Sequence, residues 1–165
     1  MSRNAGSRGL ERFTGSKGEI LVDARFAPLY LTSWRGKVDA EVLDKLYAWL
    51  LDESAAIAAK GGCIAYVNDL GAIETASSGV RQIFVDRAAN LRHTVHGQVN
   101  VGAWHVVGEG EARGILAKLA WVSPNDWKGY EVSSWAEGIR AAQEALREAG
   151  IEIEEPEPED YAFPD

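Results

Sequence analysis

The spacing of apolar residues along the chain alternates between the two-residue period of strands and the three-to-four-residue period of helices. Residues 19–26 and 29–36 are rich in apolar and β-prone side chains, which predicts two strands that pair as a hairpin. From about residue 40 to 59, apolar side chains recur three and four positions apart. This spacing predicts an amphipathic helix, and Asp39 stands where an N-cap is expected.

The rest of the chain continues this alternation of strand and helix. The expected segments are strands at 63–67, 98–107 and 130–132, and helices at 78–93, 109–120 and 134–148. The predicted order is therefore β-β-α-β-α-β-α-β-α, and strands joined through helices are normally parallel. We predict an α/β fold with a single mixed β-sheet, mostly parallel with an antiparallel first strand, and about four helices.

The two ends of the chain differ in composition from the segment between them. Residues 1–18 combine glycine and serine with basic residues, and residues 151–165 hold seven acids and no base. Segments of this kind bury too little apolar surface to fold alone. We therefore expect a disordered basic N-terminal tail, one domain over residues 19–150, and a disordered acidic C-terminal tail.

The charge and the cysteine content narrow the functional classes. The net charge is −8, of which the last fifteen residues supply −7, so the predicted domain is nearly neutral. It has no basic stripe, which argues against nucleic acid as a partner. Residues 1–18 lack the apolar core of a secretory signal, no apolar run is long enough to span a bilayer, and Cys63 is the single cysteine. We expect a cytoplasmic protein without disulfides.

The stretch from Ala65 to Val80 joins a predicted strand to a predicted helix and carries the most distinctive pattern. The apolar run ends at Asp69-Leu70, and Ala76-Ser77-Ser78-Gly79 opens the helix. A hydroxyl at this position can cap the free backbone N–H groups. The same N–H groups and the helix dipole can also hold a phosphate.

These residues and the element order resemble the STAS domain of the anti-sigma factor antagonists and, more distantly, the CRAL-TRIO lipid-transfer domain. The resemblance implies a non-enzymatic bacterial signalling module that contacts a serine kinase, an anti-sigma-type regulator or a homodimer partner. It also implies phosphorylation at Ser77, with Ser78 as the second candidate, which adds about −1.5 to −2 charges. The implied interaction loop comprises Asp69, Leu70, Ser77, Ser78 and Gly79.

Two alternatives stay open at this stage. Ser77 and Ser78 can act only as helix caps, the commonest role of serine at such a position. The likeness to lipid-transfer domains suggests instead a protein that binds a lipid or a small apolar ligand between sheet and helices. The six tryptophans are many for this length, and Trp34, Trp104 and Trp121 are the candidate contacts of such a ligand or of a partner.

Other combinations of residues are incomplete as chemical sites. Gly108, Gly110 and Gly114 have a spacing loosely like a dinucleotide loop, but two glutamates among them would repel a pyrophosphate. His93 and His96 have a metal-ligand spacing without further ligands. We therefore expect no catalytic residues, no cofactor and no metal.

Overall fold

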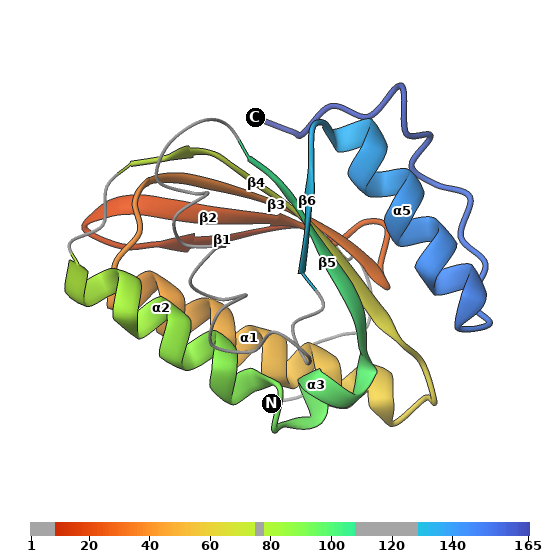
Figure 1. Cartoon of the computed structure of the whole chain (residues 1–165), viewed down its shortest axis with the longest axis horizontal. Helices are drawn as coiled ribbons and strands as arrows, with labels where there is room; N and C mark the ends of the chain where they lie inside the picture. The colour runs from red at the N-terminus through yellow and green to blue at the C-terminus, as the bar shows by residue number, and fades with distance from the viewer. Residues whose placement is uncertain (1–8, 75–77, 108–128) are drawn as a thin grey trace.

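Six strands form one mixed sheet in the order β1-β2-β3-β4-β5-β6 (Figure 1). The computed structural model describes residues 9–74, 78–107 and 129–165. β1, β2 and β3 pair antiparallel, and β4, β5 and β6 continue the sheet in parallel. The strands are β1 (Leu10–Thr14), β2 (Lys17–Asp23), β3 (Leu29–Lys37), β4 (Ile64–Ile73), β5 (Asn100–Val106) and β6 (Gly129–Val132).

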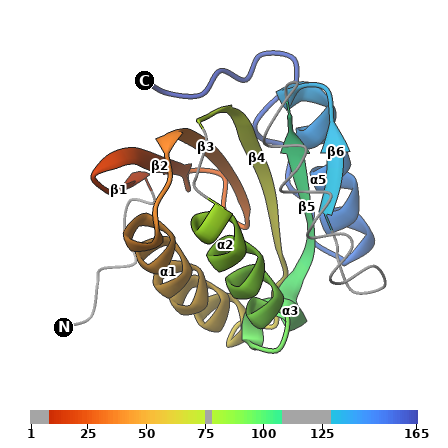
Figure 2. The ribbon, with the colours of Figure 1, turned by 60° about the vertical axis from the view of Figure 1, so that its left-hand side comes forward.

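Helices cover both faces of the sheet. α1 (Ala40–Ala58), α2 (Ser78–Leu91) and α3 (Val95–Val99) lie on one face, and α5 (Trp135–Glu148) lies on the other (Figure 2). The predicted α/β class, with a single mixed sheet and four helices in the described part, is confirmed. None of these four helices has both the length and the apolar character needed to cross a bilayer.

The predicted N-cap at Asp39 is present, and the start of α5 is capped as well. The Asp39 carboxylate accepts a hydrogen bond from the Val42 backbone N–H at 3.0 Å. At the start of α5, the Ser134 hydroxyl accepts from the Glu137 N–H at 3.2 Å, while the Glu137 carboxylate accepts from the Ser133 N–H at 2.7 Å. Both helices therefore begin where side chains satisfy free backbone donors.

The N-terminal segment differs from the expected tail. Residues Leu10–Thr14 form β1, which pairs with β2 along its whole length at the edge of the sheet. Arg12 forms an ion pair with Glu19 at 2.8 Å, and the Phe13 ring lies 5.8 Å from the Trp49 ring. One aromatic anchor and a full set of backbone hydrogen bonds hold a strand whose sequence is mostly polar.

Three boundaries also differ from the prediction. β4 continues through Ile73, so Asp69 and Leu70 lie inside a strand and not at the start of a loop. The short helix α3 occupies residues 95–99, where the sequence predicted the start of a strand at 98. The helix expected at 109–120 lies outside the described residues.

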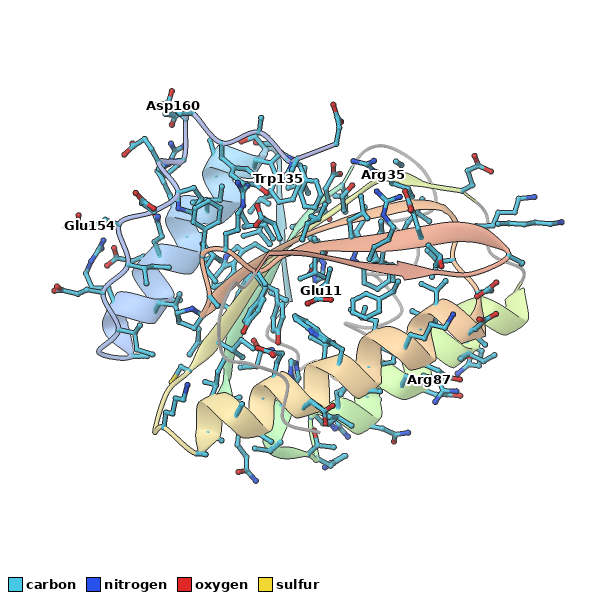
Figure 3. The ribbon with its side chains drawn as sticks, turned by 180° about the vertical axis from the view of Figure 1, so that it is seen from behind. Glu11, Arg35, Arg87, Trp135, Glu154 and Asp160 are labelled. Carbon is cyan, nitrogen blue, oxygen red and sulfur yellow. The ribbon has the colours of Figure 1, made fainter. Side chains whose placement is uncertain are left out.

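The C-terminal segment 151–165 packs along α5, which corrects the expectation of a disordered tail (Figures 1 and 3). The Gln143 side chain donates a hydrogen bond to the Pro156 carbonyl at 3.0 Å. The Trp135 ring lies 5.3 Å from the Tyr161 ring and 5.7 Å from the Phe163 ring. The apolar residues set among the acids therefore give this segment enough contact area to fold onto the domain.

Two clusters of buried side chains form the core, one on each face of the sheet. The cluster beneath α1 and α2 is aromatic and large, with Tyr30, Trp34, Trp49 and Tyr66. The cluster beneath α5 is mainly aliphatic, with Leu29, Leu31, Val67, Ile139 and Leu146 as fully buried members. The two sides of the sheet are visible in Figure 3, where the labelled Arg87 and Trp135 lie on opposite sides.

Candidate functional site: a polar row beside a cavity

Polar side chains from three adjacent strands form a row inside the aromatic face of the sheet. Thr32 of β3 is in register with Asn68 of β4, and Asn68 is in register with His105 of β5. All three are buried, at 3%, 9% and 5% exposure. Because side chains alternate between the two faces of a strand, registered residues of parallel neighbours point to the same face.

Hydrogen bonds run along this row in one direction. The Trp34 indole N–H donates to Thr32 Oγ1 at 2.8 Å, and the Thr32 hydroxyl donates to Asn68 Oδ1 at 2.7 Å. Asn68 Nδ2 lies 3.3 Å from His105 Nδ1. An indole only donates, and an amide nitrogen only donates, so His105 Nδ1 accepts and the proton of the neutral ring is on Nε2.

Both buried histidines on this face are neutral at physiological pH. Burial lowers the pKa of His105 to about 4 and that of His96 to about 4, since a charged imidazolium loses its hydration there. The row and its surroundings therefore present uncharged polar groups.

A second polar group lies next to the row. The His96 ring is 5.4 Å from the Tyr66 ring, and His96 Nδ1 lies 2.9 Å from the Ser54 hydroxyl. Burial raises the pKa of Tyr66 well above its usual value, while the nearby Ser54 hydroxyl acts in the opposite direction. Yet within the described part of the chain the Tyr66 hydroxyl has no hydrogen bond of ordinary geometry. Tyr66 is therefore a neutral phenol, and its buried hydroxyl lacks a well-formed hydrogen bond within the described residues.

A cavity of about 140 Å³ lies between this face of the sheet and the helices α1, α2 and α3. An apolar cavity of about 150 Å³ in another protein holds benzene, so this volume suits a single ring. The residues around it are Thr32, Trp34, Leu46, Tyr47, Leu50, Tyr66, Asn68, Ala88, Leu91, Arg92, His96, Gly97, Asn100, Ala103 and His105. Its walls are thus apolar and aromatic, with the polar row and Tyr66 among them.

Of the implied interaction loop, the structure describes Asp69 and Leu70 in β4 and Ser78 and Gly79 in α2. The Asp69 carboxylate accepts from the Gly71 N–H at 2.9 Å inside β4, and Leu70 is buried in the core. Ser77 lies outside the described residues. Ser78 and Gly79 begin α2, where the structure describes the backbone and not the Ser78 side chain. The strand residues Asp69 and Leu70 are therefore ordinary members of the sheet.

The three tryptophans named as ligand contacts are divided between different places. Trp34 lines the cavity. Trp104 lies on the opposite face of the sheet, where its ring stacks on Tyr130 at 5.4 Å. Trp121 lies outside the described residues. Of the two that fall in the described residues, Trp34 is therefore the one that lies where a ligand between sheet and helices would contact it.

The sequence carries a partial signal for the polar row. Thr32, Asn68 and His105 each interrupt an apolar strand at an inward-facing position. Buried polar side chains are kept where they are hydrogen-bonded to one another or to a ligand. Thr32 and His105 lie inside predicted strands, whereas Asn68 directly follows the strand predicted at 63–67 and enters the row because β4 runs on to Ile73.

Other candidate chemistry is not supported by the arrangement of side chains. The Arg92 guanidinium donates to His93 Nε2 at 2.9 Å, while His96 contacts Ser54. No group of metal-ligating side chains occurs among the described residues. Cys63 is half-buried beside the aliphatic cluster, and the glycines 108, 110 and 114 lie outside the described part.

Comparisons with known proteins leave the family open. No protein-family model matches the chain, and no curated protein matches it by sequence. The resemblance to the STAS domain therefore stays a prediction, and the functional argument depends on the geometry of the site.

Proposed function

We propose that this protein binds a small uncharged organic ligand in the cavity between the sheet and helices α1, α2 and α3. The observation that carries the proposal is the cavity of about 140 Å³ with a hydrogen-bonded polar row in its wall. Ligand sites are typically apolar pockets with a few well-placed polar groups. A cavity kept only for packing would instead be filled by side chains.

The charge state of the wall supports an uncharged ligand. His96 and His105 are neutral at physiological pH, because burial lowers the pKa of both to about 4. The guanidinium of Arg92 is exposed and donates to His93. Burying a carboxylate or a phosphate here without a buried cation would cost several kcal/mol.

The volume supports a ring-sized ligand over a membrane lipid. An acyl chain needs far more space than a cavity that holds about one ring. The expected ligand is therefore a small apolar compound, as the sequence suggested, and its size is limited to about one ring.

Filling the cavity tests this function. Ala103 of β5 lines the cavity, and Ala145 of α5 packs on the opposite face of the sheet. Ala103→Phe should abolish binding of cumene, an apolar ring compound, in isothermal titration calorimetry, while Ala145→Phe should leave its affinity unchanged. Equal cumene binding by both variants, or none by the wild type, would contradict a ligand site in this cavity.

The regulatory module implied by the STAS resemblance is a second candidate function. It is favoured by the start of α2 at Ser78, next to Ser77 in the sequence, because a phosphate is well accommodated at a helix N-terminus. Capture of a kinase or regulator by the wild type and its loss with Ser77→Asp would support this function. The same captured proteins with both baits would count against it.

A further inference from the structure

We infer that the ligand is a neutral ring compound with a carbonyl oxygen, and that Tyr66 donates a hydrogen bond to this oxygen. The inference rests on the proposed function, and it adds the chemical class of the ligand. It follows from counting which polar atoms around the cavity are already engaged.

Three side-chain acceptors around the cavity are already engaged by protein donors. Asn68 Oδ1 accepts from Thr32, and His105 Nδ1 accepts from Asn68. Asn100 Oδ1 accepts from the Gly102 N–H at 3.1 Å. A ligand that offers only N–H or O–H donors would find the His105 nitrogen occupied and one of the two lone pairs of each amide oxygen already used.

The Tyr66 hydroxyl differs from these acceptors because it lacks a well-formed hydrogen bond within the described residues. It is buried, and no hydrogen bond of ordinary geometry is found for it in the described ranges 9–74, 78–107 and 129–165. The nearby Ser54 hydroxyl is paired with His96 Nδ1 at 2.9 Å. The neutral phenol carries a proton that it can donate, and a buried donor without an acceptor is costly. A carbonyl oxygen in the cavity would supply that acceptor.

The neighbouring rings favour a planar ligand. Tyr66 stacks on Tyr30 at 5.6 Å and lies 5.4 Å from the His96 ring, and Trp34 also contributes to the cavity wall. Aromatic side chains pack best against flat partners in offset or edge contacts. The combination of flat walls and one buried donor matches an aryl or conjugated cyclic ketone.

Three probes of similar shape separate the two proposals. Acetophenone carries a phenyl ring and a neutral carbonyl, cumene carries an isopropyl group of similar size in place of the acetyl group, and benzoate carries a charged carboxylate there. Titration calorimetry at pH 7.5 should give about fivefold tighter binding of acetophenone than of cumene, and the weakest binding for benzoate.

Variants of the two stacked tyrosines assign the effect to one hydroxyl. Tyr66→Phe should remove the preference for acetophenone and leave the affinity for cumene unchanged. Tyr30→Phe is the matched control, because the Tyr30 hydroxyl donates to Glu53 at 2.7 Å and Tyr30 does not line the cavity. It should keep the preference.

The outcomes distinguish a failure of this inference from a failure of the proposed function. Binding of cumene and acetophenone with equal affinity would overturn the carbonyl ligand while the cavity remained a binding site. Benzoate as the tightest probe would overturn the neutral class. No binding of any probe would overturn both proposals.

Discussion

The two faces of the sheet show two different ways of packing helices on strands. Beneath α5 the contact is close: a Cβ atom at Gly138 would lie 2.6 Å from Val67 Cγ1, so the helix backbone rests directly on β4. Beneath α1 and α2 the side chains are large aromatics, and a cavity of about 140 Å³ remains. The comparison indicates that one face is closely packed, while the other leaves the space in which we propose that a ligand binds.

Truncation of a buried leucine should have its largest effect on the α5 face. Leu146 is fully buried among aliphatic neighbours, so Leu146→Ala should lower the free energy of unfolding by about 3–4 kcal/mol. Leu91→Ala, in the wall of the cavity, should cost only about 1 kcal/mol, because the side chain is half-buried. Urea denaturation of both variants checks the difference, and equal losses would contradict the division between the faces.

Adding a methyl group should reveal the same contrast. Gly138→Ala should destabilise the protein by about 2 kcal/mol, because the new Cβ would overlap with Val67. Ala103→Val adds volume beside the cavity and should cost less than about 1 kcal/mol. Thermal unfolding of the two variants measures both effects, and a larger loss for Ala103→Val would show that the cavity face is the tighter one.

Acid should weaken the cavity face through its buried histidines. The folded protein holds the pKa of His105 at about 4, below the value of about 6.5 in an unfolded chain. The unfolded state therefore takes up the proton first as the pH falls, and stability is lost between pH 6.5 and 4. This histidine should contribute a loss of roughly 1.5 kcal/mol between pH 6.5 and 5.

One substitution separates the histidine effect from the titration of carboxylates. His105→Gln should flatten the dependence of the unfolding free energy on pH in this interval. If His105→Gln showed the wild-type slope, His105 would not be the group that titrates.

The two stacked tyrosines should respond differently to loss of their hydroxyl groups. Tyr30→Phe removes the hydrogen bond to Glu53 and should cost about 1 kcal/mol. Tyr66→Phe removes a buried hydroxyl that has no hydrogen bond in the described part, so the stability should stay the same or rise slightly. Chemical denaturation of both variants checks this, and an equal loss would place an effective partner beside Tyr66.

The sequence predicted the elements whose signals are local. The helix that begins after Asp39 follows from its N-cap and apolar periodicity, and the helix predicted at 134–148 is also present. β1 was missed because an edge strand needs few apolar residues and draws its stability from backbone bonds to β2. The acidic C-terminal segment was misjudged because its contacts, such as that of Tyr161 with Asp23, join residues far apart in the chain.

The assembly of the site could not be predicted for a similar reason, although single residues of it carry a signal in the sequence. Thr32, Asn68 and His105 are separated by more than thirty residues each, and only the register of three parallel strands brings them into one row. Trp34 was named as a ligand contact and lines the cavity, but the same reasoning placed Trp104 there, and it lies on the other face. A shift of one residue in strand register moves a side chain to the other face of the sheet, and the sequence pattern does not fix the register that closely.

The ligand site on the aromatic face is tested most directly by locating where a small ring compound binds on the protein. Cumene should be titrated into the isotopically labelled protein and followed by two-dimensional amide NMR. Saturable shifts are expected at Ala88, Leu91 and Ala103 around the cavity, and none at Ile139 on α5. Shifts concentrated on α5, or no saturable shift at all, would contradict a binding site on the aromatic face.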